Sequence, residues 1–237
     1  MRNIILLLSG LLIVACGGKK QEETTKVISV EDYETSTFSV SAGDGSVEGL
    51  LGNVTQDEIE RVFSENRSAM MRCYESALED VEEIEGDLQF DLEVASDGSV
   101  QSAFISSSNL GAIAAEECML SRIKSFHFKR APGGVAVFYY PMTLEAPYDP
   151  PDPDIWNNAR VAKVLGEHTA EVEACLSGVT GVHVTAYVGK GGMVLSAGAA
   201  GDESAAYECA VCLARAARSW VFQAPPSNDL VKVRLDF

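Results

Sequence analysis

Two cysteines in the sequence YECAVCL, Cys209 and Cys212, stand at a spacing that supports thiol or metal chemistry. The C-x-x-C spacing is used by thiol-disulfide oxidoreductases and forms half of many zinc sites. The same spacing also arises on one face of a helix, because residues three positions apart are neighbours there. The spacing alone therefore leaves a redox centre, a zinc site and a structural role open.

Other residues that could do chemistry are scattered. The three histidines, at positions 127, 168 and 183, fall on different expected elements, and no serine or aspartate stands with them in the order of a catalytic triad. Zinc held by the cysteines of the second half would need a fourth ligand such as His183, which falls on an expected strand. The acidic run 75–85 lacks the D-x-D-x-D-G spacing of a calcium loop. We therefore expect no metal, no cofactor and no enzymatic activity.

The charge balance argues against nucleic acid as a partner. The 237-residue chain has 18 basic and 35 acidic residues, and its net charge of −17 repels phosphate backbones and anionic lipid headgroups. Its hydrophobic fraction of 46% is ordinary for a globular protein. We expect one large or two small domains, no nucleic-acid partner, and no contact with a membrane except through an anchor.

The N-terminal sequence MRNIILLLSGLLIVACGG resembles a bacterial lipoprotein signal. Its apolar run over 4–14 is too short to span a bilayer core of about 30 Å but suits a secretory signal. The segment L-I-V-A-C resembles a lipobox, which implies removal of residues 1–15 and acylation of Cys16. The residue after Cys16 is Gly17 and not an aspartate, which resembles the pattern of lipoproteins sent to the outer membrane. The alternative is an ordinary signal cut nearby, with Cys16 not lipidated.

Residues 16–52 are rich in Gly, Ser, Thr, Glu and Lys, which predicts a lipid-anchored flexible linker. A small hairpin over 41–47 is an alternative for part of this segment, because Asp-Gly is a favoured turn pair. The expected location is the outer membrane, with the chain facing the periplasm. That compartment is oxidising, so the other five cysteines are disulfide candidates.

The segment 53–146 predicts a helix, two strands, a helix and a third strand. T-Q-D-E at 55–58 fits a capping box, and apolar residues then recur at helical spacing up to Val81. Alternation in GDLQFDLEV predicts a strand with one solvated face, and S-D-G-S turns the chain into a strand from 100 to about 106. A helix over about 110–124 and a strand in GGVAVFYYPMTL complete the unit.

A proline-rich linker over 147–154 separates this unit from a second one at 155–237. The second unit predicts the same order: a helix over 155–176, a strand GVHVTAYV, a glycine turn, a strand from Met193, a helix over 204–219 and a strand DLVKVRLDF. One constant offset of 94 aligns five positions. They are Gly98, Val100, Cys118, Phe126 and Phe128 with Gly192, Val194, Cys212, Trp220 and Phe222. We infer an internal repeat.

The repeat assigns roles to the cysteines. Each unit has one cysteine on its first helix and one on its second, and the simplest use of such a pair is a disulfide between the helices. This predicts the disulfides Cys73–Cys118 and Cys175–Cys212. Cys209 aligns with an alanine, so its thiol is expected to lie outside both bonds. A thioredoxin-like role for Cys209 and Cys212 remains the alternative, although helix-compatible residues precede the pair.

The first unit resembles the AgmX/PglI C-terminal domain family, a relative of the TonB C-terminal domain. The matching residues are Arg72-Cys73-Tyr74-Glu75, Gly86, Asp97-Gly98-Ser99-Val100, Cys118, Phe126-His127-Phe128, Gly133-Gly134 and Tyr140-Pro141. The resemblance implies one disulfide per domain and a binding or scaffolding module of cell-envelope complexes. The second unit departs from the pattern, because Leu176-Ser177 replaces Tyr-Glu and Pro225-Pro226 replaces the glycine pair.

The expected fold is therefore α+β, with two tandem TonB-C-like units, each a three-stranded sheet covered by two helices. The expected function is a periplasmic protein-interaction or scaffolding module, and the alternatives are a thiol-disulfide oxidoreductase or a carrier of a small apolar ligand. Pro141 predicts that the last strand of the first unit lies at a sheet edge. We expect a partner to dock on 134–140, with contacts from Val135, Val137, Tyr139 and Tyr140. The alternative is that the linker or the second unit covers this edge.

Overall fold

The computed structural model describes residues 40–42, 45–47, 54–130, 134–146, 153–225 and 230–237. The expected signal segment, the lipidation residue Cys16 and most of the linker lie outside the described residues. Within the expected linker, β1 (Val40–Ala42) and β2 (Gly45–Val47) form an antiparallel hairpin. None of the helices that the structure describes has the length and hydropathy to cross a membrane.

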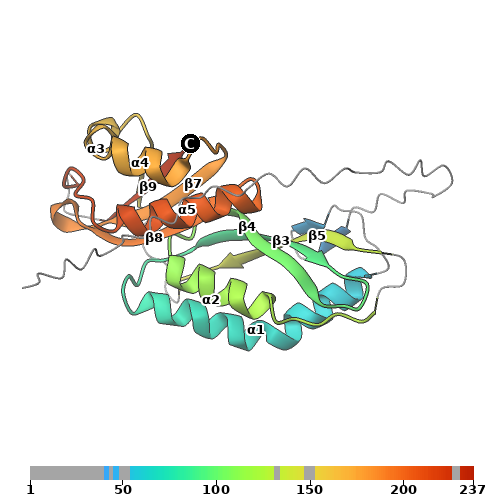
Figure 1. Cartoon of the computed structure of the whole chain (residues 1–237). Helices are drawn as coiled ribbons and strands as arrows, with labels where there is room; N and C mark the ends of the chain where they lie inside the picture. The colour runs from blue at the N-terminus through green and yellow to red at the C-terminus, as the bar shows by residue number, and fades with distance from the viewer. Residues whose placement is uncertain (1–39, 43–44, 48–53, 131–133, 147–152, 226–229) are drawn as a thin grey trace, which may run out of the picture.

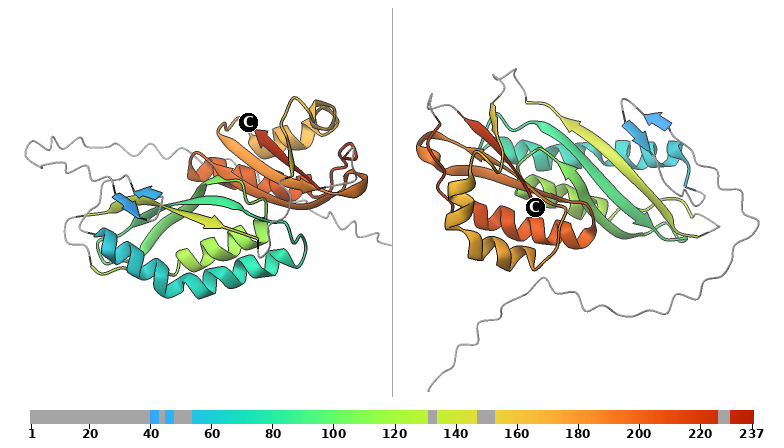
Figure 2. Two further views of the ribbon diagram at one scale, coloured as in Figure 1. Left: turned by 180° about the vertical axis from the view of Figure 1, so that it is seen from behind. Right: turned by 90° about the horizontal axis from the view of Figure 1, so that it is seen from above.

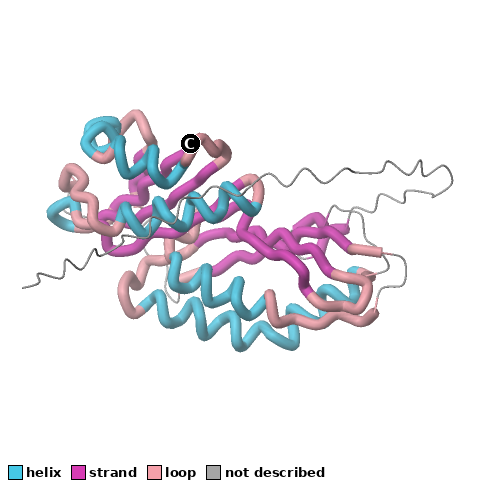
Figure 3. Tube along the Cα trace, viewed as in Figure 1, coloured by secondary structure: helices cyan, strands magenta, loops and turns pink. Residues whose placement is uncertain are grey.

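The first unit has two helices on one side of a three-stranded antiparallel sheet (Figures 1 and 3). Its elements are α1 (Gln56–Leu78), β3 (Gly86–Val94), β4 (Val100–Ser108), α2 (Ile113–Ile123) and β5 (Ala136–Leu144). The strand order is β4-β3-β5. The expected capping box is partly formed, because the Thr55 hydroxyl accepts a hydrogen bond from the Glu58 amide at 3.3 Å. The fold of this unit follows the order predicted from the sequence.

The alternating pattern of β3 places its apolar residues against the helices. Leu88, Phe90, Leu92 and Val94 are all at most 2% exposed, whereas the residues between them are half-buried or exposed. The second helix is shorter than predicted, and neither Ser108 nor Asn109 caps it, since its first turn follows Ala112 without a side-chain cap. The Asn109 side chain instead accepts a hydrogen bond from Asp87 at the start of β3.

The second unit differs from the prediction at its beginning. Its elements are β6 (Asp154–Trp156), α3 (Ala162–Glu167), α4 (Thr169–Leu176), β7 (Val182–Val188), the 3-10 turn η1 (Lys190–Gly192), β8 (Val194–Gly201), α5 (Ser204–Ala217) and β9 (Val231–Asp236). The sheet has four strands in the order β6-β9-β7-β8, with β6 parallel to β9. Across the described residues the structure thus has five α-helices and two main sheets, an α+β fold.

Two expectations for this unit are wrong. A single helix over 155–176 is replaced by a strand and two short helices, and the sheet has four strands rather than three. The expected linker also ends earlier, because Asp154 belongs to β6. The physical reason is a pairing with the far end of the chain. The Asn158 side chain donates to the Asp236 carbonyl at 2.7 Å and accepts from its amide at 3.1 Å, which fixes this segment beside β9.

The strand pairings of the two units repeat at the predicted offset. Val94 pairs with Val100, and 94 positions later Val188 pairs with Val194. The isolated bridge between Ser99 and His127 likewise recurs between Met193 and Val221. Gly98 and Gly192 both have positive φ, of 93° and 81°. A Cβ on either would meet the Phe128 or Phe222 carbonyl oxygen at about 2 Å, so both turns require glycine.

The two units pack directly against each other (Figure 2). β4 of the first unit contacts β8 of the second, and each also contacts the other unit's second helix, α5 or α2. β4 and β8 are the outer strands of their sheets. Their contact shields two strand edges, which native sheets commonly protect against unwanted pairing.

Candidate partner-binding site

β5 lies at the edge of the first sheet. Among the described residues its backbone ladder runs only to β3, from Ala136 opposite Val94 to Leu144 opposite Gly86. Pro141 falls inside this strand, as the sequence predicted. The β1–β2 hairpin forms a separate sheet, but β2 lies beside β5 (Figure 1). The hairpin, which belongs to the expected linker, therefore lies where the alternative hypothesis predicted that the linker would cover this edge.

Three of the four expected contact residues lie in β5, on its two different faces, and Val135 lies just before the strand. Tyr140 points toward the helices and stacks on Phe63 of α1, with ring centroids 3.6 Å apart and planes 10° apart. Val137 and Tyr139 pair with Glu93 and Asp91 of β3, on strand positions that alternate with those of the buried face. The expected set therefore does not form one surface.

The outer face of the first sheet is partly apolar. Val135 and Val137 are 43% and 47% exposed, and Tyr139 is half-buried. Asp91 lies opposite Tyr139, and burial raises its pKa above the usual value, although a hydrogen bond with Ser106 acts the other way.

A groove of about 200 Å³ runs between α1 and β5. Its lining residues are Phe63, Ser64, Arg67 and Met71 of α1 and Tyr140, Pro141, Met142, Thr143 and Leu144 of β5. Burial raises the pKa of Tyr140, and the Arg67 guanidinium acts in the opposite direction. The sequence did not predict this groove. The i, i+4 spacing of Phe63, Arg67 and Met71 was its only signal, and that spacing does not identify the strand that packs beside the helix.

The junction between the units is built around a buried carboxyl group. Glu116 of α2 is fully buried. Its Oε1 accepts a hydrogen bond from the Ser108 hydroxyl at 2.8 Å, and its Oε2 accepts one from the Ala199 amide of β8 at 2.7 Å. A Cβ on Gly198 would lie 2.3 Å from the carboxylate, so only glycine admits this approach. Glu116 thus provides the hydrogen-bond acceptor for an outward-facing backbone amide of β8, an edge strand of the other unit.

No cation among the described residues forms an ion pair with Glu116. Burial raises the pKa of Glu116 to about 7, although the hydrogen bonds from Ala199 and Ser108 lower it. The nearby Arg215 of α5 pairs with Glu117 at 2.7 Å. An ionised carboxylate is costly in such a place unless hydrogen bonds compensate for its lost hydration.

A second part of the junction joins the first unit to β7 and β9. The Tyr187 hydroxyl accepts from the Glu85 amide at 3.3 Å, and Lys232 Nζ donates to the Glu85 carbonyl at 2.9 Å. Gly111, with a φ of 73°, lies so close to the Tyr187 ring that an added Cβ would contact it at 3.0 Å. These polar contacts occupy the space between the units.

The buried hydroxyl of Tyr207, on α5, leads to a prediction about stability. This hydroxyl has no hydrogen-bond partner among the described residues, and burial raises its pKa. Tyr207→Phe removes only this hydroxyl, so we expect the free energy of unfolding to stay unchanged or to rise by up to about 1 kcal/mol. Urea unfolding measures this. The control is Tyr74→Phe, which loses a bond to the Ile84 carbonyl and should cost about 1 kcal/mol. A larger loss from Tyr207→Phe would show that the hydroxyl has a partner.

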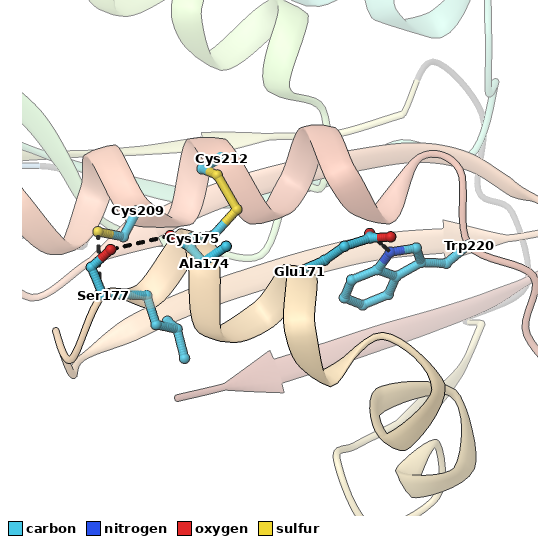
Figure 4. Close-up of a disulfide and its surroundings, with 8 residues drawn as sticks. Glu171, Ala174, Cys175, Ser177, Cys209, Cys212 and Trp220 are labelled. Carbon is cyan, nitrogen blue, oxygen red and sulfur yellow. Dashed lines mark hydrogen bonds between the residues drawn. A yellow bond between two sulfur atoms is a disulfide. The ribbon is translucent and has the colours of Figure 1, made fainter. Parts of the chain in front are cut away.

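The cysteines form two disulfides, Cys73–Cys118 and Cys175–Cys212, which are the pairs that the repeat predicts. Each joins the helices of one unit. Cys209 lies outside both bonds, is 1% exposed, and its Sγ contacts the Leu176 carbonyl at 3.7 Å (Figure 4). Beside the second disulfide, the Trp220 indole donates to Glu171 at 2.9 Å.

This arrangement does not favour the redox alternative. Cys212 is bonded to Cys175 on another helix rather than to Cys209. Cys209 lies in the middle of α5, five residues after its first residue, away from the helix N-terminus that lowers thiol pKa values. In the parts of the chain that the structure describes, no group of three or more His, Cys, Asp or Glu side chains is placed to hold a metal ion.

His183 takes part in a local ion cluster. Its Nδ1 lies 2.8 Å from Asp236 and its Nε2 lies 3.1 Å from Asp202. Burial lowers the pKa of His183, but the hydrogen bonds to the two aspartates outweigh it, so the net pKa is raised. The cluster ties the start of β7 to the end of β9 and to the turn before α5. Both ring nitrogens are engaged, so this histidine serves the fold.

Comparisons with known proteins found no relative. No protein-family model matches the chain, and searches of curated proteins and of solved structures returned no match. The resemblance of the first unit to the AgmX/PglI C-terminal domain stays a proposal that rests on the residues named above.

Proposed function

We propose that this protein is a non-enzymatic interaction module of the cell envelope, in which β5 binds an extended segment of a partner protein. One observation supports this proposal most strongly: β5 is an edge strand with a groove along one side and the exposed Val137 on its other face. An edge strand offers backbone amides and carbonyls to an added strand, and neighbouring pockets select its side chains.

The geometry assigns different roles to the two faces. A strand added to β5 would place alternate side chains toward the α1 groove and toward the outer face of the sheet. On the groove side they would meet Tyr140, Met142 and Arg67, and on the outer face Val137 and Tyr139. In this proposal the β1–β2 hairpin beside β5 is a resident cover that the partner displaces.

The proposal places the protein at the outer membrane, anchored through acylated Cys16 and facing the periplasm, with TonB-C-like units. Support comes from the lipobox-like sequence, from the two disulfides, which are typical of exported proteins, and from the repeated strand pairings. The alternative of an apolar ligand between the units is less well supported, because that junction contains the buried carboxyl group of Glu116.

The anchor has a direct test. Cys16→Ala removes the thiol to which the acyl chain would attach, so we expect an uncleaved or soluble species instead of a membrane-bound one. Intact mass and detergent partitioning of the expressed protein measure this. A Cys16→Ala chain that still partitions into detergent with the mass of the acylated form would contradict the anchor.

The binding site is tested by photocrosslinking in intact cells. A photoreactive amino acid at Val137 should give a discrete adduct with another protein, because this side chain is 47% exposed on β5. Glu208 is the matched control, since it is exposed on α5 away from β5. Equal adducts at both positions, or no adduct at Val137, would reject β5 as the binding site.

A further inference from the structure

The two units present different side chains at equivalent surface positions. In the first unit the residues around the bridge that follows the β3–β4 turn are Ser99, Gln101 and His127. The equivalent residues of the second unit, 94 positions later, are Met193, Leu195 and Val221. Three polar side chains are thus replaced by three aliphatic ones. Because the first unit forms the same pairing with polar residues, the fold does not require aliphatic side chains here.

These aliphatic side chains are unusually exposed. Met193 is 62%, Val221 61% and Leu195 38% exposed. The bridge between Met193 and Val221 places these two side by side, and Leu195 follows two residues later, where it packs over Gly189. Single exposed apolar residues need no explanation, but a contiguous group typically marks an interaction surface.

The two chain segments that form this group contain basic but no acidic residues, whereas the chain as a whole is acidic. Lys190 lies in η1, and Arg218 ends α5 three residues before Val221. The stretches 186–201 and 209–225 contain no acidic residue, although the chain has 35. The equivalent stretches of the first unit, 92–107 and 115–131, contain four: Glu93, Asp97, Glu116 and Glu117. Figure 1 shows that η1 and the end of α5 lie at the same end of the second sheet.

The negative charge along α5 is distant from this end. Glu208 is the last acidic residue of α5 and precedes Arg218 by ten positions, a separation of about 15 Å along the helix axis. At physiological salt, interactions between exposed charges are largely screened beyond about 8 Å. Glu208 therefore has little effect on what this surface attracts.

We propose that the apolar tip, defined as Met193, Leu195 and Val221 with Lys190 and Arg218, docks on an anionic lipid surface. The aliphatic side chains enter the boundary between headgroups and acyl chains, and the two cations meet lipid phosphates. This contact is additional to the anchor expected at Cys16 and does not depend on it. It would fix how the second unit lies against a membrane while β5, in the first unit, remains open to a partner.

The test uses the chain from residue 17 onward, a deletion that leaves every described element in place. We expect it to co-sediment with phosphatidylglycerol vesicles, less at high salt, and weakly with phosphatidylcholine vesicles. The variant Met193→Ser, Leu195→Gln and Val221→His installs the residues of the first unit, and should lower the partition coefficient roughly tenfold or more. Lys190→Gln with Arg218→Gln should lower binding to phosphatidylglycerol only.

Val135→Ser with Val137→Ser is the matched control, because it removes the exposed valines of the first unit and should leave vesicle binding unchanged. Circular dichroism and intact disulfides establish that each variant is folded. Absence of binding by the unsubstituted chain, or equal binding by the triple variant, overturns the proposal. A dimer that the triple variant abolishes, without vesicle binding, also overturns it and assigns the tip to contacts between copies.

Discussion

Replacing Cys73 and Cys118 together with alanine is expected to lower the free energy of unfolding by about 4 kcal/mol. The bond closes a loop between residues 45 positions apart, and the chain-entropy relation gives this loss for a loop of that length. The same relation gives a similar loss for the Cys175–Cys212 bond, which spans 37 positions. Urea unfolding under non-reducing conditions measures both.

Cys209→Ala is the matched control for this experiment. Cys209 is buried but belongs to neither disulfide, so its replacement removes one sulfur atom from the core and should cost about 1 kcal/mol. If either double variant costs no more than Cys209→Ala, the disulfides do not stabilise the units. A Cys209–Cys212 bond found by non-reducing peptide mapping would contradict the pairing and raise the redox alternative.

Glu116→Gln is expected to change how stability depends on pH. The pKa of Glu116 rises from an ordinary value of 4.5 to about 7 in the folded protein. Between these values the folded state binds more protons than the unfolded state, so the contribution of Glu116 to stability falls as pH rises. The full loss is about 3 kcal/mol and is complete above about pH 7.

The measurement is urea unfolding of both proteins from pH 4.5 to pH 8. Subtracting one stability profile from the other removes the contributions of all other titrating groups. These include groups with the opposite pH dependence, such as Glu58, whose pKa is lowered to about 2 chiefly by its hydrogen bond with Arg61. Glutamine keeps an oxygen that accepts a hydrogen bond from the Ala199 amide. The free energy of unfolding of the variant should therefore increase relative to that of the native chain as pH rises. Parallel profiles would show that Glu116 stays ionised across this range.

The elements that the sequence predicted well are those whose partners are close in the chain. The alternation of Leu88, Phe90, Leu92 and Val94 identifies β3 and its buried face, because a strand with one solvated face has a period of two. The repeat also predicted the disulfides, because each unit has one cysteine on its first predicted helix and one on its second. The edge position of β5 followed from Pro141.

The features that the sequence did not predict depend on contacts between distant segments. β6 forms a strand because it pairs with β9, about 75 residues later, and local helical spacing over 155–176 contains no sign of this. Nothing in the sequence distinguishes Glu116 from the other acidic residues of the helices, but packing against the second unit buries it. The groove beside β5 arises from the packing of α1 against a strand from the other end of the unit.

Hydrogen exchange on β5 tests the central claim most directly. The chain is compared alone and in the photocrosslinked complex formed through Val137, with exchange measured by mass spectrometry of peptides that cover 134–144. We expect the amides of β5 to become protected in the complex, because an added strand pairs with the edge opposite β3. Amides that are already protected in the chain alone, and unchanged in the complex, would contradict this expectation and leave β5 as a covered edge.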